Sequence, residues 1–358
     1  MTYLRTSVFI APLLLAGCAH NVTPHLTGPF PQNLSEWRLF TGAAADLKPN
    51  RGVVPYDLNT TLFTDYAVKH RYVWMPPGTA AIYNASKTFV FPKGAILVKT
   101  FGYPDAALDG KLRLIETRLL VNGEGGWFTL PYIWNRAQTD AVLDTHAAPL
   151  EVNWRRPQGG NYAIQYAIPN ADQCRQCHDR NKITGPLGPT ASHLNRDFAY
   201  DAGTANQLTY WTRIGYLKGA PDPALARRQA VWDDVSTGSV EQRARAYLDV
   251  NCAHCHRAGG DANDSGLYLS DQETDPMRLG IFRTPVESDT IPAGMSYDVV
   301  PGRPDLSILA YRMSSEHPKL RMPDLGRTLV HKEAVALVRR WIAEQPSAVS
   351  DQRSATPR

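Results

Sequence analysis

Four of the five cysteines in this 358-residue chain form two close pairs, each followed directly by a histidine. C-x-x-C-H is the attachment motif for c-type haem. Two thiols one helical turn apart can each form a thioether with one vinyl group of a haem, and the adjacent histidine then binds the iron. The sequence therefore predicts two covalently bound haems c, with attachment at Cys174, Cys177, Cys252 and Cys255 and axial ligation by His178 and His256.

Three other uses of paired cysteines fit this sequence less well. A zinc site needs four ligands close together, whereas 74 residues separate Cys177 from Cys252, against about 15–20 in a zinc ribbon. A thioredoxin-like redox pair does not require a histidine after each second cysteine. Disulfides are compatible with an exported chain, but adjacent cysteine pairs are poor staples for long loops. The repeated histidine therefore favours haem.

A haem iron has a second axial position, and its ligand separates electron carriers from sites that react with oxygen or peroxide. For the second haem we expect Met322, which lies in Arg321-Met-Pro-Asp-Leu-Gly326 just before the last predicted helix. This segment resembles the ligand loop of class I cytochromes c. Met313 and Met295 are alternatives, although the helical spacing around Met313 also suits core packing.

The second axial ligand of the first haem stays open among three residues. His193 follows the first motif closely and could fold back over the haem, while His70 and Met75 precede it in the β-rich region. A histidine of this kind is more often a core or surface residue than a ligand. His254, inside the second motif, is expected to be a spacer that points away from the iron.

The first 18 residues predict export. Arg5 precedes an apolar run from Val8 to Ala16, which is a signal-peptide pattern too short to span a bilayer. The run ends in Leu-Ala-Gly-Cys18, which resembles the lipobox of bacterial lipoproteins and so implies lipid attachment to Cys18. Ala19 after this cysteine favours the outer membrane. The alternative is an ordinary secretory signal with an incidental cysteine.

The composition is that of an ordinary globular chain, with 43% hydrophobic and 20% charged residues. The formal net charge is +4, and the lysines and arginines are scattered along the chain. This distribution argues against nucleic-acid binding and leaves a diffuse basic surface that could dock an acidic redox partner.

The region before the first motif is rich in strand signals. Segments 87–91, 95–101, 112–121 and 127–134 have strand patterns, and the residues from Asn122 to Gly126 predict a hairpin turn. We expect a sandwich-like β-domain. Its aromatic residues Trp127, Tyr132 and Trp134 favour core packing over an exposed binding platform.

Helix signals dominate from residue 169 onward. Asn170 with Gln173 and Ser239 with Gln242 have capping-box spacing, and further helices are predicted at 206–217, 224–235, 305–311 and 330–344. The expected fold is α+β and multidomain, with mainly α-helical haem domains. Its parts are a signal peptide (1–18), a flexible tether (19–30), a β-rich domain (31–168), a first haem region (169–236), a class I cytochrome c-like domain (237–346) and a disordered tail (347–358).

With these motifs in place, the chain resembles a family of proteobacterial lipoprotein-type di-haem c-type cytochromes over almost its whole length. The segments that carry the resemblance are 56–66, 91–95, 116–120, 194–198, 243–256 and 300–304. The resemblance implies two haems, ligation by His178, His256 and Met322, and a parallel β-helix protein encoded alongside as a candidate partner. It implies no particular enzymatic reaction.

Electron transfer between redox partners at the periplasmic or outer-membrane face is the function we expect. One alternative is a haem-dependent oxidoreductase or peroxidase, with its substrate site at the β-domain or the first haem. Another is a non-catalytic assembly module that docks a partner through the β-domain. The β-rich region offers no compact constellation of His, Glu and Asp and no nucleophile motif that would identify a catalytic centre.

Overall fold

The computed structural model describes residues 21–105, 108, 111–146, 149–155, 160–286 and 291–346. The predicted signal peptide with Cys18 and the predicted tail at 347–358 lie outside the described residues. Among the helices of the described part, none is long and apolar enough to cross a bilayer.

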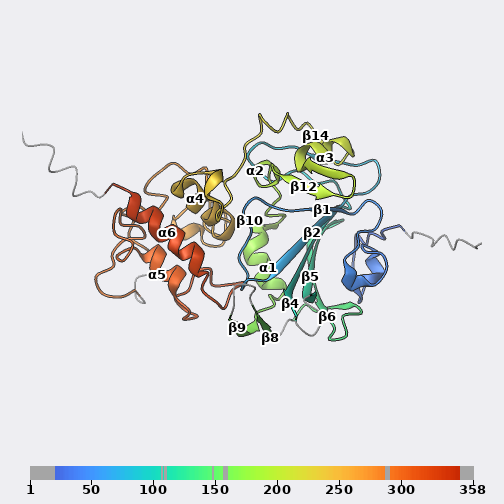
Figure 1. Ribbon diagram of the computed structural model, residues 1–358, viewed down its shortest axis with the longest axis horizontal. Helices are drawn as coiled ribbons and strands as arrows, with labels where there is room; N and C mark the ends of the chain where they lie inside the picture. The colour runs from blue at the N-terminus through green and yellow to red at the C-terminus, as the bar shows by residue number, and fades with distance from the viewer. Residues whose placement is uncertain are drawn as a thin grey trace, which may run out of the picture.

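A six-stranded antiparallel sheet is the centre of the N-terminal half (Figure 1). Its strands, in spatial order, are β1 (Val54–Tyr56), β2 (Val68–Trp74), β4 (Ile96–Pro104), β5 (Leu112–Gly123), β6 (Gly126–Trp134) and β7 (Ala141–Leu143). The predicted hairpin is confirmed, because Gly123 pairs with Gly126 across the turn between β5 and β6. Gly126 has a φ of +112°, a conformation open to glycine.

The two faces of this sheet meet different parts of the chain, because alternate side chains of a strand point to opposite faces. One face packs under the N-terminal segment with the short 3-10 helices η1 (Leu34–Trp37) and η2 (Ala44–Asp46). On that face Tyr132 and Trp134 are buried, which agrees with the expected core packing. The other face meets α1 (Ala171–His178), α2 (Ala191–Leu194) and α3 (Gln207–Arg213).

Residues 21–30 differ from the expected flexible tether. Val22 is buried in the core on the N-terminal face of the sheet, and the amide of Thr23 donates to the carbonyl of Trp37 at 3.1 Å. This part of the chain is thus packed, because its apolar side chains meet the sheet.

The expectation of mainly α-helical haem domains is wrong. Between 169 and 236 the helices α1, α2 and α3 are short, and turns and two-stranded ladders separate them. Prolines and glycines in the segment 185–189 prevent longer helices there. The two-stranded ladders of the structure are β3 (Ala81–Ile82) with β14 (Leu217–Lys218), β8 (Leu150–Arg155) with β9 (Asn161–Tyr166), β10 (Asp179–Arg180) with β11 (Ile183–Thr184), and β12 (Asp197–Tyr200) with β13 (Gly203–Asn206).

The helix expected at 224–235 is also absent from the described residues, although Asp222 accepts a hydrogen bond from the amide of Ala224 as a cap would. Tertiary hydrogen bonds replace it. The Asn195 side-chain amide donates to the carbonyls of Pro223 and Ala226. These bonds use backbone groups that a helix would need internally.

The C-terminal region holds α4 (Val240–Asn251), α5 (Ile308–Ser314) and α6 (Lys332–Glu344). Figure 1 shows these helices on the side of the molecule away from the N-terminal segment, and α4 packs against α6. Of the 106 described residues between 237 and 346, only 32 belong to these helices. The described residues between 252 and 307 form turns, bends, isolated bridges and the 3-10 helix η5 (Asn263–Ser265), so this region too is less helical than predicted.

Candidate functional site

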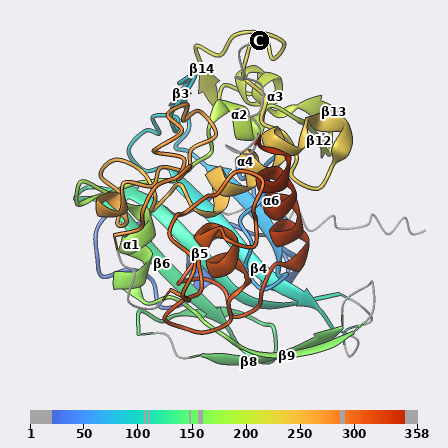
Figure 2. The same ribbon diagram turned by 90° about the vertical axis from the view of Figure 1, so that its left-hand side faces the viewer.

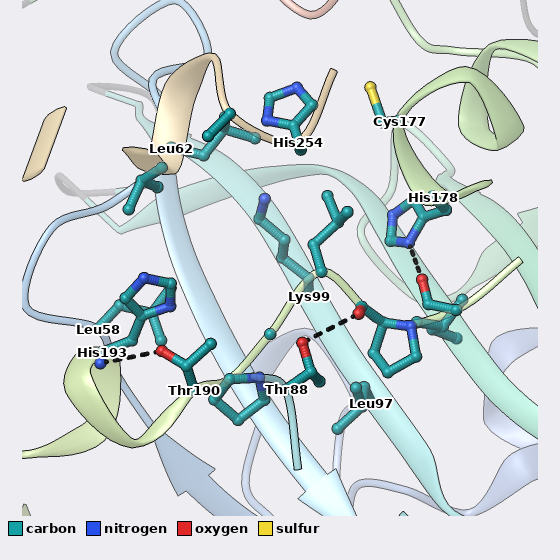
Figure 3. Close-up of a pocket in the computed structure, with 18 of the residues that line it drawn as sticks. Leu58, Leu62, Thr88, Leu97, Lys99, Cys177, His178, Thr190, His193 and His254 are labelled. Atoms are coloured by element: carbon teal, nitrogen blue, oxygen red, sulfur yellow. Dashed lines mark hydrogen bonds between the residues drawn. The ribbon is translucent and has the colours of Figure 1, made fainter. Parts of the chain in front are cut away.

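A cavity of about 650 Å³ lies beside α1, over the sheet face formed by β2, β4 and β5 (Figure 3). Its volume falls within the range of about 300–1,000 Å³ that is common for small-molecule and cofactor sites. Residues far apart in the sequence share its wall, among them Leu58, Leu62, Leu97, Lys99, Cys174, Cys177, His178, His193 and His254.

The first motif forms one wall of this cavity. The predicted capping box is confirmed: the Asn170 side chain accepts from the Gln173 amide at 2.9 Å and starts α1. The helix ends at His178, whose Nδ1 is 2.9 Å from the carbonyl oxygen of Gly185 (Figure 3). A backbone carbonyl on one ring nitrogen is a common way to orient a metal-binding histidine. Burial lowers the pKa of His178, which favours the neutral imidazole that metals bind.

The second motif follows α4 directly. The predicted capping box is again confirmed, because Ser239 accepts from the Gln242 amide, and Cys252 is buried at the end of the helix. His256 Nδ1 lies 3.2 Å from the Ser265 hydroxyl. Burial lowers the pKa of His256 to about 4, so this ring is neutral near pH 7.

Met322 lies in the wall of a second, small cavity that Cys252 also lines. Two hydrogen bonds hold the loop there: the Met322 amide donates to the carbonyl of Arg312 at 3.0 Å, and its carbonyl accepts from Arg327 at 2.9 Å. Met313 borders the same cavity but is 5% exposed within the C-terminal core. Met295 lines neither this cavity nor the large one.

The two motifs meet. The thiols of Cys177 and Cys255 and a ring nitrogen of His254 all lie within 4.8 Å of one another. A hydrogen bond between the two thiols lowers the pKa of Cys177 and raises that of Cys255. His254, expected as a spacer, thus lines the large cavity beside the first motif.

The loops that follow the two motifs are also joined. The amide of Asn181 donates to the carbonyl of Gly259 at 2.9 Å. A side chain at Gly259 would meet the Asn181 amide group at 2.3 Å, and its φ is +73°. This contact therefore requires glycine.

His193 is the only one of the three candidate ligands for the first haem that lines the large cavity within the described residues. One of its ring nitrogens, Nε2, lies 3.2 Å from Asp249, and Gln229 donates to the same carboxylate at 2.8 Å. Burial raises the pKa of Asp249, but the hydrogen bonds from His193, Gln229 and the Asp271 amide, together with the charge of His193, leave this pKa lowered. A carboxylate on the second ring nitrogen is typical of metal-binding histidines.

His70 and Met75 are placed elsewhere. His70 is on β2 between residues of the cavity face, so its side chain points to the opposite face of the sheet. Met75 is 1% exposed in the core between the sheet and α2 and α3. Neither residue borders the cavity.

Sequence reasoning missed three basic residues of the cavity wall. Arg71, Lys99 and Arg118 lie on neighbouring strands and all face the cavity. Burial, with the charges of the two arginines, holds the pKa of Lys99 well below its ordinary value. The available signal was that Lys99 shares a strand face with the apolar residues Leu97 and Phe101, where a charge is unusual.

The segment 57–66 fastens both motif-bearing regions to the sheet. The Asn59 side-chain amide donates to the carbonyl of Ser192, next to His193, at 2.8 Å. The amide of Phe63 donates to Asn251, the last residue before the second motif, at 2.7 Å. This segment therefore links the region around His193 to the start of the second motif.

Asp65 at the end of this segment binds the loop that carries Met322. Its carboxylate accepts hydrogen bonds from the amide and hydroxyl of Thr328 and from the amide of Leu329, all between 2.7 and 2.9 Å. Asp65 is 1% exposed. Loss of such a buried acceptor leaves several donors unpaired.

The residues around the first motif fit a covalently attached haem. The cavity is large enough for a cofactor, its wall carries two thiols and an imidazole whose Nδ1 is already held, and leucines provide apolar contacts. Comparison with protein-family models, with curated proteins and with solved structures found no match to this chain.

Proposed function

We propose that this protein is an exported di-haem c-type cytochrome that transfers electrons between redox partners. The observation that carries the proposal is the meeting of its two C-x-x-C-H motifs, with the sulfur atoms of Cys177 and Cys255 within 4.8 Å. Two haem-attachment sites in contact suit a protein through which electrons pass from one site to the other.

In this proposal each motif holds one haem, which supplies the reversible one-electron chemistry of its iron. Cys174 and Cys177 attach the first haem and His178 binds its iron, while Cys252, Cys255 and His256 do the same for the second. Met322 beside Cys252 is the proposed second ligand there, and His193 across the cavity is the candidate for the first. The leucines of the cavity wall would shield the haem from water, which tunes its potential.

The proposal extends to the surroundings of the protein. The lipobox-like sequence ending in Cys18 supports a lipid anchor on the periplasmic side, with the outer membrane favoured over the inner. Redox proteins are the proposed partners. The resemblance to lipoprotein-type di-haem cytochromes adds a parallel β-helix protein as a candidate.

The test is electron exchange within the purified protein, made together with haem-maturation machinery. After rapid mixing with less than one equivalent of a small reductant, both haems should become partly reduced faster than protein molecules exchange electrons with one another. The rate at which the electrons redistribute between the two haems should not depend on protein concentration. A second haem that stays oxidised, or a rate that rises with concentration, would contradict the proposal.

A soft metal ion is the second candidate ligand, because Cys177, Cys255 and His254 form a compact set of sulfur and nitrogen donors. Three such donors with one open position suit zinc or monovalent copper. This use requires free thiols, whereas haem attachment converts them to thioethers. Thiol titration together with elemental analysis separates the two: free thiols with bound zinc or copper favour the metal site, and bound iron without free thiols favours haem.

A further inference from the structure

Arg71, Lys99 and Arg118 form a row of positive charge across the wall of the large cavity. Lys99 on β4 is directly opposite Arg71 on β2 and Arg118 on β5. Directly opposite residues on neighbouring strands have Cβ atoms about 4.5–5.5 Å apart, and like charges at such positions destabilise a sheet. Repulsion between these three cations therefore destabilises the sheet unless negatively charged groups bind them.

The protein itself supplies only part of that negative charge. Asp57 pairs with Arg71 at 2.8 Å, and Glu116 pairs with Arg118 through two hydrogen bonds. Within the described part of the chain, the side-chain amine of Lys99 has no hydrogen bond or ion pair, and it lies 4.8 Å from the centre of the Phe101 ring. Arg71 Nη2 is buried and has no hydrogen-bond partner among the same residues.

The unmatched donors come from strands other than the one that the first motif packs against. The helix α1, which carries Cys174 and Cys177, packs against β6 (Figure 2). In the sheet order, β4 is two strands and β2 three strands from β6, which corresponds to about 10 and 14 Å at a strand spacing of about 4.8 Å. Figure 3 shows Lys99 extending into the cavity between His178 and His193.

Haem carries its two vinyl groups along one edge and its two propionate carboxylates along the opposite edge. Attachment at Cys174 and Cys177 would fix the vinyl edge beside α1 and would direct the propionates across the cavity. We infer that Lys99, together with Nη2 of Arg71, binds the propionate carboxylates of the first haem. This inference rests on the proposed function, and charge-assisted hydrogen bonds between these cations and carboxylates would remove the repulsion within the row.

The same chemistry would recognise a small free carboxylate such as succinate. The two sources differ in one respect: propionates arrive with the covalently attached haem, whereas a free acid exchanges with solvent. An experiment must therefore observe the propionates directly and also offer the protein a free carboxylate.

The experiment uses the full protein carrying haem labelled with carbon-13 at the propionate carboxyl carbons. Infrared difference spectra between the oxidised and reduced protein report the labelled carboxylate bands. Lys99→Met removes the charge, Lys99→Arg keeps it, and Lys48→Met changes an exposed lysine in the N-terminal segment as the control. Calorimetric titration with succinate is carried out on the same four proteins.

We expect the labelled bands to shift in Lys99→Met only, with Lys99→Arg and Lys48→Met close to wild type and no succinate binding by any of them. If wild type and Lys99→Met each carry two haem adducts and their labelled carboxylate bands are identical, this inference is overturned and the proposed function still stands. Succinate binding that is lost in Lys99→Met, with unchanged propionate bands, would also overturn it. Protein without haem adducts would overturn the proposed function itself.

Discussion

The sulfur atoms of Cys177 and Cys255 lie within 4.8 Å of each other, although 77 residues separate them in the sequence. Each is the second cysteine of its motif. Thioethers at both positions would bring the attached edges of two porphyrins together. The bond between Asn181 and Gly259 joins the loops that follow the two motifs, and the segment 57–66 binds Ser192 and Asn251.

If each motif carries a haem as proposed, this contact predicts electronic coupling between the two haems. Circular dichroism in the Soret region should show a couplet of opposite signs, because two strong chromophores held close together share their excitation. The double variants Cys174→Ala/Cys177→Ala and Cys252→Ala/Cys255→Ala should each retain one haem and show a simple band. A wild-type spectrum equal to the sum of the two variant spectra would contradict the predicted proximity.

Met322→Ala should change the spin state of the second haem. Without the proposed thioether ligand the ferric iron should become high-spin, and the charge-transfer band between sulfur and iron should disappear. Met313→Ala is the matched control, since Met313 borders the same small cavity but is packed in the core. It should cost about 2–5 kcal/mol of unfolding free energy and leave the band in place. If Met313→Ala removes the band instead, the assignment is wrong.

His193→Ala should affect the first haem alone. We expect its ferric iron to change from low-spin to high-spin and its reduced form to react with peroxide, as an open axial position allows. The measurement is best made with Cys252→Ala and Cys255→Ala present, so that a single haem is observed. His70→Ala serves as the control because His70 is on the other face of β2. A wild-type protein whose first haem is already high-spin would instead support the peroxidase alternative.

Asp298 should make the stability of the protein depend on pH. Burial raises its pKa from 3.8 to about 6, and its side chain is nearly inaccessible. Because the folded pKa is above the unfolded one, the folded state binds more protons between these values. The free energy of unfolding therefore falls as the pH rises from about 4 to about 6. A shift of about two units corresponds to about 3 kcal/mol.

The variant Asp298→Asn removes this penalty. The measurement is the free energy of unfolding of wild type and variant, obtained from denaturant titrations at pH 4 and at pH 7. Between pH 4 and pH 7, the stability of the variant relative to wild type should increase by about 3 kcal/mol. An equal difference at both pH values would mean that Asp298 does not titrate as its burial implies.

Local sequence signals predicted local structure well. The capping boxes at Asn170 and Ser239 start helices as expected, and the glycines between β5 and β6 form the expected turn. Each of these features depends on residues within a few positions of one another. The helix expected at 224–235 is missing because Asn195, about 30 residues earlier, binds the backbone carbonyls of Pro223 and Ala226.

The arrangement of the site depends on contacts between distant segments. The predicted residues of the first motif and His193 do share one cavity, but this follows from the attachment of Asn59 to Ser192 over 133 positions. The row of Arg71, Lys99 and Arg118 follows from strand register, which no single strand pattern specifies. For the same reason the contact between the two motifs could not be read from their spacing.

The most direct test of the central claim is the intact mass of the denatured protein after extraction with acidic organic solvent. The protein should be produced with haem-maturation machinery, and each double cysteine variant should be measured beside it. Two covalent haem adducts on the wild-type chain and one on each variant is the expected result. A wild-type chain without adducts, whose colour passes into the solvent, would contradict the account.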